Sequence, residues 1–172
     1  MSRAARLDLR SFQKELASRL ASKTAAQVES SRLGIACGER RWLIRLGDAG
    51  EVIAVPPVVT VPLTKPWFLG LANIRGNLYS VIDFPAFLGE GKVEAAALAR
   101  LVLLSPRGGE SVGIVVERVL GLRNLAQFAS EPMEDGAPSW QVARWRDAEG
   151  VSWREIDLGQ LARDPAFLQV GA

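Results

Sequence analysis

The chain has 172 residues, of which 48% are hydrophobic and 23% are charged, and its formal net charge is only +2. These values are typical of a soluble globular protein with one compact unit or two small intertwined ones. The basic residues are spread along the sequence, which therefore lacks the concentrated positive charge of most nucleic-acid-binding proteins. The sequence has no histidine and a single cysteine, Cys37, which excludes His-activated nucleophiles, an internal disulfide and a zinc site built from His and Cys.

Residues 8–22 predict an amphipathic helix, because Leu9, Phe12, Leu16 and Leu20 recur at steps of three and four residues with charged residues between them. We expect this apolar stripe to pack on the protein's own core, with docking on a partner as the alternative. Residues 23–31 are rich in Ser, Thr, Ala and Gln and predict a linker. Residues 1–31 are therefore expected to form an N-terminal helix and linker.

From residue 32 onward the pattern changes to short apolar segments separated by Gly, Pro and charged residues, which is typical of β-strands joined by turns. Helices of the length found in βαβ units are missing between these segments, so we expect mainly antiparallel β structure. The ten predicted strands cover residues 32–37, 41–46, 51–55, 58–62, 68–74, 78–83, 100–105, 111–119, 140–145 and 151–157.

A polar and Ala-rich break at residues 89–99 divides the predicted strands into two groups. We expect one domain over residues 32–165 with halves of roughly 32–90 and 99–160, whose chain ends can cross between the halves. Residues 157–170 predict a short helical tail, and residues 166–172 form the end of the chain.

Catalytic interpretations have little support in this sequence. Residues 107–113 contain glycines but lack the Lys and the spacing of a phosphate-binding loop, so they predict a hairpin turn at 107–110. Glu155 and Asp157 share one strand face and could mimic paired carboxylates, but a solvated strand edge is the better interpretation. We therefore expect no enzyme activity, no cofactor and no metal site.

Nucleic-acid binding is the main alternative function, because small β-barrels can stack bases on aromatic side chains beside a basic groove. Aromatic and basic residues occur together in one C-terminal segment: Trp140, Arg144, Trp145, Arg146, Trp153 and Arg154. Side chains alternate between the faces of a strand, so no single face of a regular strand collects both the rings and the positive charges. Core packing with a polar edge explains the segment better, and Cys37 is expected to be a small buried apolar residue.

Protein binding fits the remaining features. Trp67 and Phe68 follow Pro66, which stiffens the entry to a predicted strand, and aromatic residues are favoured in interfaces. No apolar run reaches the roughly 18 residues of a membrane span, and the N-terminus lacks a signal-peptide core. We expect a cytoplasmic protein without direct membrane insertion.

The segment "GLANIRGNLYSVIDF" resembles a motif of the CheW-like family of chemotaxis coupling proteins. Gly70, Asn73, Arg75, Gly76 and Asp83 match its pattern of G, N, R-G and D. The segment "SVGIVVERVLGL" at residues 111–122 is similar to a second family pattern. Residues 65–83 also resemble the PilI-like twitching-motility branch, which belongs to type IV pilus chemosensory systems.

The resemblance implies a fold of two small intertwined five-stranded SH3-like barrels with a groove between them and no catalysis. It implies that one barrel pairs with the regulatory domain of a CheA-like histidine kinase, and that the cytoplasmic tip of a chemoreceptor docks near the groove. Arg75 is the best single candidate for partner binding, with Asn73, Gly76, Asn77, Trp67 and Phe68 as further candidates. Asn73 and Arg75 can also simply fix a tight turn at the rim of a barrel, and both roles can hold together.

Overall fold

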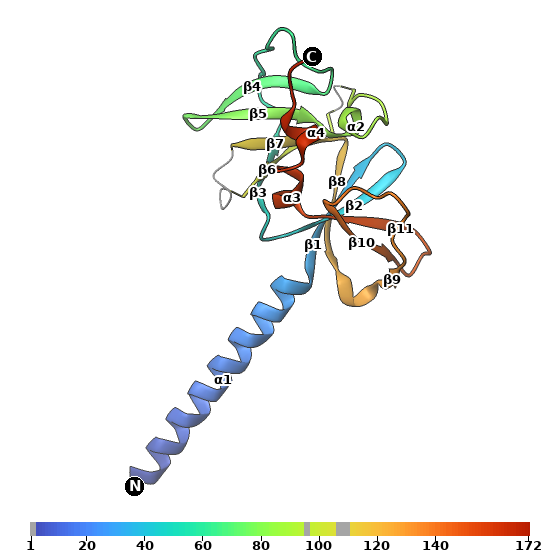
Figure 1. The fold of residues 1–172 in the computed structure, drawn as a ribbon. Coiled ribbons are helices and arrows are strands. Elements are labelled where there is room, and N and C mark those ends of the chain that lie inside the picture. The colour runs from blue at the N-terminus through green and yellow to red at the C-terminus, as the bar shows by residue number, and fades with distance from the viewer. Residues whose placement is uncertain (1–2, 95–96, 106–110) are drawn as a thin grey trace.

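The computed structural model of the chain describes residues 3–94, 97–105 and 111–172, and for residues 3–13 it describes the backbone alone. Its strands are β1 (Ser31–Cys37), β2 (Arg40–Arg45), β3 (Ala49–Ala54), β4 (Phe68–Ile74), β5 (Asn77–Asp83), β6 (Arg100–Leu104), β7 (Val112–Val116), β8 (Arg118–Asn124), β9 (Ala129–Glu131), β10 (Gln141–Arg146) and β11 (Ser152–Ile156). Its helices are α1 (Arg3–Ser30), α2 (Phe84–Phe87), the 3-10 helix η2 (Leu125–Gln127), α3 (Leu158–Leu161) and α4 (Pro165–Leu168). The protein is mainly β, as predicted, with one long N-terminal helix (Figure 1).

The strands form two sheets. Sheet A has the order β8-β1-β2-β11-β10-β9, and sheet B has the order β3-β6-β7-β5-β4. Most neighbours are antiparallel, whereas β2 with β11 and β5 with β7 are parallel. The division between the sheets does not fall at the polar break of residues 89–99. The first two strands join the C-terminal strands in sheet A, so the first and last strands of the chain belong to the same sheet.

The chain passes from sheet B to sheet A at a single residue. The sequence predicted one strand over residues 111–119, but Val116 ends β7 and Arg118 begins β8 in the other sheet. Glu117 lies between them, and its carboxylate accepts a hydrogen bond of 3.0 Å from the amide of Gly38. One continuous apolar run therefore contributes strands to both sheets. The periodicity of the sequence does not show where the chain changes from one sheet to the other.

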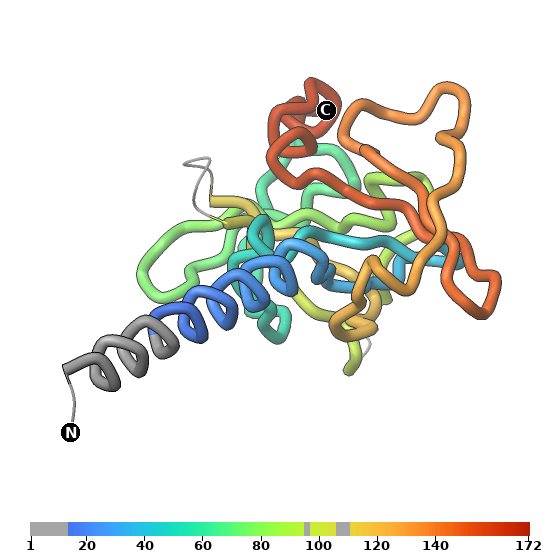
Figure 2. Tube along the Cα trace, turned by 90° about the horizontal axis from the view of Figure 1, so that it is seen from below, coloured from blue at the N-terminus to red at the C-terminus, as the bar shows by residue number. Residues whose placement is uncertain are grey.

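Two apolar cores explain the uninterrupted apolar runs of sheet B. In β6, Leu101 and Leu103 face a core enclosed by sheet B, whereas Val102 and Leu104 face the core between the two sheets. Side chains alternate between the faces of a strand, so burial of both faces requires a continuous apolar sequence. The short helices α3 and α4 cover the core between the sheets and contribute buried Leu161 and Phe167 to it (Figure 1, Figure 2).

The predicted linker at residues 23–31 is wrong, because α1 continues to Ser30 before β1 begins. The segment contains Ala, Gln and Lys, which favour helix, and its hydroxyl groups bond back to carbonyls of the preceding turn. Thr24 Oγ1 donates to the carbonyl of Leu20 over 2.8 Å, so this side chain does not interrupt the helix.

The expected packing of the N-terminal stripe on the protein's own core is also wrong for the described side chains. Leu16 is 49% exposed and Leu20 is 58% exposed. The side chains of Leu9 and Phe12 lie outside the described residues. As Figure 1 shows, α1 leaves the two sheets at β1 and extends away from them.

Two other features of the predicted layout differ from the structure. Residues 58–62 do not form a strand, because Pro56, Pro57 and Pro62 remove backbone donors, and only Val59 makes a bridge, with Leu71. The short strand β9 was not predicted. The predicted turn at residues 107–110 lies outside the described residues.

Candidate functional site

The β4–β5 hairpin presents the polar turn that the sequence singled out. Arg75 and Gly76 both have positive φ angles, of 52° and 86°, the backbone pattern of a two-residue turn between twisted strands. The side-chain oxygen of Asn73 accepts a hydrogen bond of 2.9 Å from the amide of Gly76. A Cβ added to Gly76 would meet no atom within 4 Å, so this position of the turn faces open space. Asn73 thus holds the turn in shape.

Arg75 reaches across the open side of sheet B. Its Nη2 lies 2.7 Å from Oε1 of Glu51 on β3, and β3 and β4 are the two outer strands of the sheet. The contact therefore joins the two edges of sheet B. The Arg75 side chain is 74% exposed, so the ion pair contributes no more than about 1 kcal/mol to stability. The guanidinium group has five donors, which leaves some for an acceptor on a partner.

Exposed apolar side chains lie beside this turn. Leu78 is directly opposite Asn73 in the hairpin and is 60% exposed. Val59 is opposite Leu71, two residues before Asn73, and is 73% exposed. Directly opposed residues share a sheet face, so both side chains lie on the face that carries Asn73. We call the group Val59, Asn73, Arg75 and Leu78 the turn surface. Asn77 lies opposite Ile74 and is therefore on the other face of the hairpin. The sequence analysis missed Val59 and Leu78.

Trp67 and Phe68 lie elsewhere, at the start of β4. They are separated from Arg75 by a full strand, roughly 20 Å at about 3.3 Å per residue. The Trp67 ring packs edge-on against Phe87 at 5.3 Å and stacks on Phe167 of α4 at 6.2 Å between centroids. Phe68 packs against the core between the sheets. The structure gives both residues a packing role and does not bring them to the turn surface.

Glu155, which the sequence predicted at a solvated strand edge, forms a buried ion pair with Arg32 in sheet A. Glu155 is only 2% exposed, so that expectation is wrong. Its Oε1 accepts a hydrogen bond of 2.8 Å from Nε of Arg32, and its Oε2 accepts one of 2.8 Å from the indole of Trp145. Arg45 Nε is 3.4 Å from the same carboxylate. The pairing of β11 between β2 and β10 makes it an inner strand, and sequence spacing does not show this.

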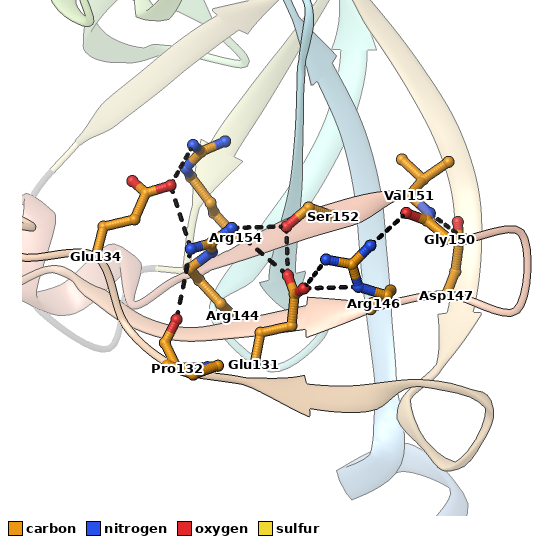
Figure 3. A network of polar contacts seen from close by, with 10 residues as sticks. All are labelled: Glu131, Pro132, Glu134, Arg144, Arg146, Asp147, Gly150, Val151, Ser152 and Arg154. Atoms are coloured by element: carbon orange, nitrogen blue, oxygen red, sulfur yellow. Dashed lines mark hydrogen bonds and ion pairs between the residues drawn. The ribbon is translucent and has the colours of Figure 1, made fainter.

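The arginines that suggested nucleic-acid binding are paired with carboxylates (Figure 3). Arg154 Nη2 lies 2.8 Å from Glu134, and Arg144 lies 3.4 Å from the same carboxylate. Arg146 Nε donates to Glu131 over 2.7 Å. The hydroxyl of Ser152 also donates to Glu131, and these bonds together hold the pKa of this carboxyl below its ordinary value.

The tryptophans of the same segment do not form a stacking surface. Trp140 is 4% exposed and Trp153 is 1% exposed, and both belong to the interior. The Trp153 indole donates to Asp147 over 2.8 Å. Burial acts to raise the pKa of Asp147, but this bond and two backbone amide bonds outweigh it and lower the pKa. These two rings are unavailable to bases, which confirms the core-packing interpretation for Trp140 and Trp153, whereas Trp145 is half-buried.

Three further observations bear on chemistry. Cys37 is fully buried, as expected, and burial raises the pKa of its thiol far above the ordinary value. Within the described ranges, no group of three or more Cys, Asp and Glu side chains is placed to hold a metal ion. None of the described helices is long and apolar enough to span a membrane.

The fold is a mainly β module of two sheets, with an exposed turn at the end of the β4–β5 hairpin. The chain belongs to the CheW-like domain family, whose model matches residues 32–166. It is 29% identical to Protein PilI of Pseudomonas aeruginosa over 161 residues, which cover 88% of each chain. It is 22% identical to Chemotaxis protein CheW of Rhizobium meliloti, covering 72% of this chain and 79% of the relative.

A solved structure shows the same fold. The scaffolding protein TtCheW from Thermoanaerobacter tengcongensis superposes with a TM-score of 0.65 at 18% sequence identity, covering 76% of this chain and 85% of that chain. The family model that matches residues 32–166 confirms the family suggested by the R-G turn motif. In the structure, two motif residues have clear local roles: Asn73 holds the turn, and buried Asp83 accepts from the amides of Ala86 and Val93 to fix α2 and the segment after it.

Proposed function

We propose that this protein is a non-catalytic signalling adaptor that couples a chemoreceptor to a CheA-like histidine kinase and controls type IV pilus twitching motility. It acts in the cytoplasm, where it is recruited to receptor arrays at the membrane. The observation that carries the proposal is the similarity to PilI over 88% of both chains, together with the family match over residues 32–166.

The turn surface supplies the physical basis for partner contact. Arg75 offers a planar set of donors that suits a carboxylate, and the hairpin turn fixes the backbone position from which it projects. Leu78 and Val59 supply exposed apolar area beside it. Apolar area around a central Arg is the composition expected of an interface core. By the family resemblance, the partners are the regulatory domain of the kinase and the cytoplasmic tip of the receptor.

The test is calorimetric titration of the folded protein with the kinase regulatory domain and with a receptor tip fragment. We expect Arg75→Ala to weaken one of these contacts by about 1–3 kcal/mol without loss of the fold. Arg146→Ala is the matched control, because it also removes an exposed, ion-paired arginine, at 53% side-chain exposure, but from sheet A.

Two results would count against the proposal. If the wild type binds neither partner, the adaptor function is wrong. If Arg75→Ala lowers thermal stability and binding in equal measure, Arg75 acts by fixing the turn, and the binding contact lies elsewhere.

A further inference from the structure

Three arginines lie directly opposite one another on the face of sheet A that carries Glu155. Arg32 on β1 is paired with Arg123 on β8 and with Arg45 on β2. Directly opposed residues share a face of the sheet, and like charges in such positions repel. The carboxylate of Glu155 accepts a bond of 2.8 Å from Arg32 and lies 3.4 Å from Arg45. Arg123 is therefore the member of this row that Glu155 does not neutralise.

A second arginine, Arg41, shares an aromatic ring with Arg123. The guanidinium carbon of Arg41 lies 5.5 Å from the centre of the Trp153 ring, and that of Arg123 lies 5.4 Å from it. None of the ion pairs between described residues includes either arginine. A Cβ added to Gly34 would lie 3.1 Å from the Trp153 ring and 3.3 Å from Arg123. The lack of a side chain at Gly34 thus lets the ring and Arg123 pack against β1.

Both arginines line one cavity with Trp153. Its volume is about 190 Å³, and its other walls are Gln127, Phe128 and residues 147–149 of the β10–β11 turn. We call the group Arg41, Arg123 and Trp153, with these walls, the arginine pocket. One water occupies about 30 Å³ of the liquid, so the pocket has room for a group of several heavy atoms.

Two carboxylates also line the pocket, and their surroundings decide which charge it accepts. Both oxygens of Asp147 are engaged, because they accept bonds of 2.8–3.0 Å from the amides of Glu149 and Val151 and from the Trp153 indole. The charge of Arg41 acts on Asp147, but the two residues are not among the ion pairs of the described chain. Glu149 is exposed, so water screens its charge. The pocket therefore keeps guanidinium donors for an anion, while Glu149 disfavours a group with two negative charges.

We propose that the arginine pocket binds one carboxylate group, whose oxygens accept hydrogen bonds from Arg41 and Arg123. Guanidinium and carboxylate groups match in charge and in planar geometry. The aromatic ring already orders both arginines, which lowers the cost of fixing them around a ligand. The carboxylate belongs either to an acidic side chain of a partner protein or to a small organic acid. The inference does not depend on the turn surface or on the receptor and kinase proposed above.

The test is an NMR titration of the full-length protein with sodium acetate, followed at the indole N–H of Trp153. Sodium chloride at equal concentration is the control for ionic strength. Acetate should shift this signal in a saturable way, and chloride should not. We expect Arg123→Met and Arg41→Met each to weaken acetate binding by roughly tenfold or more, because each removes a charged donor. Arg118→Met is the matched control, because Arg118 is an exposed arginine of the same strand β8 outside the pocket, and it should leave binding unchanged.

Two further comparisons test the sign of the ligand and its source. Glu149→Gln should tighten acetate binding by roughly twofold to fivefold, because it removes a screened like charge beside the site. A short peptide with one Glu between Gly and Ala residues is then compared with acetate, with the Gln peptide as its control. Tighter binding of the Glu peptide assigns the carboxylate to a protein partner, and tighter binding of acetate assigns it to a small acid.

Four outcomes would overturn the inference. Acetate leaves the Trp153 signal unmoved at about 0.1 M, where a site of millimolar affinity would be filled. Chloride shifts the signal as much as acetate does. Glu149→Gln weakens binding, which makes the ligand a cation. Inorganic phosphate binds more tightly than acetate, which makes the ligand a phosphate group.

Discussion

Replacement of Glu155 by Ala should lower the free energy of unfolding by about 3–5 kcal/mol, because it leaves a buried positive charge without its partner. Arg32 is 9% exposed, so its guanidinium group cannot regain full hydration in the folded variant. The substitution removes the acceptor of two bonds of 2.8 Å, from Arg32 Nε and from the Trp145 indole. It also removes the weaker contact with Arg45 at 3.4 Å.

The assay is urea unfolding followed by tryptophan fluorescence, for which the five tryptophans give the signal. The double variant Arg32→Met with Glu155→Leu is the control, since replacement of both charges by apolar groups can be nearly neutral. We expect the double variant to lose less stability than Glu155→Ala alone. A loss below about 1 kcal/mol for Glu155→Ala, or a double variant at least as unstable, would refute the reasoning.

Three other predictions concern the hairpin, the aromatic cluster and acid stability. Asn73→Ala should lower the free energy of unfolding by about 1 kcal/mol, because the amide of Gly76 loses its acceptor, and should also weaken partner binding measured by calorimetry. Trp67→Ala should lower the free energy of unfolding, measured in urea, by about 3 kcal/mol, because the Trp67 ring packs on Phe87 and Phe167. The affinity of the folded variant for the partner should not change. The lowered pKa of Asp147 means that its contribution to stability is present above the ordinary value of 3.8 and is lost as the pH falls through the folded value. The stability difference between the wild type and Asp147→Asn, followed by urea unfolding across pH, should therefore shrink as the pH is lowered from 7 to below about 4.

The class of fold could be predicted because the signals that set it are local. Short apolar runs, glycine turns and the absence of intervening helices indicate β structure without knowledge of strand order. The R-G turn could be recognised for the same reason. Asn73, Arg75 and Gly76 are neighbours in sequence, and their geometry depends on little beyond the hairpin.

The arrangement between sheets could not be predicted, because it depends on contacts between distant residues. One strand over residues 111–119 is a reasonable prediction from apolar content, yet the chain changes sheets at Glu117. The burial of Glu155 depends on Arg32, which lies 123 residues away in sequence. Pattern analysis assigns a charged residue near a strand end to the surface unless such a partner is known.

The candidate site was predicted in part. The turn residues were found, but the apolar neighbours Val59 and Leu78 came from strand register, which only the structure gives. Trp67 and Phe68 were grouped with Arg75 by closeness in sequence, whereas an extended strand places its two ends far apart. The full extent of α1 does not follow from composition, because Ser and Thr are typical of linkers, yet their hydroxyl groups can also bond within a helix, as those of Thr24 and Ser30 do here.

The central claim is that the protein joins a receptor and a kinase through separate surface contacts. Analytical ultracentrifugation of the protein mixed with the kinase regulatory domain and a receptor tip fragment tests it most directly. The account predicts a complex that contains all three components and that Arg75→Ala weakens while Arg146→Ala does not. Sedimentation of the three components as separate species, at concentrations where the protein is folded, would contradict it.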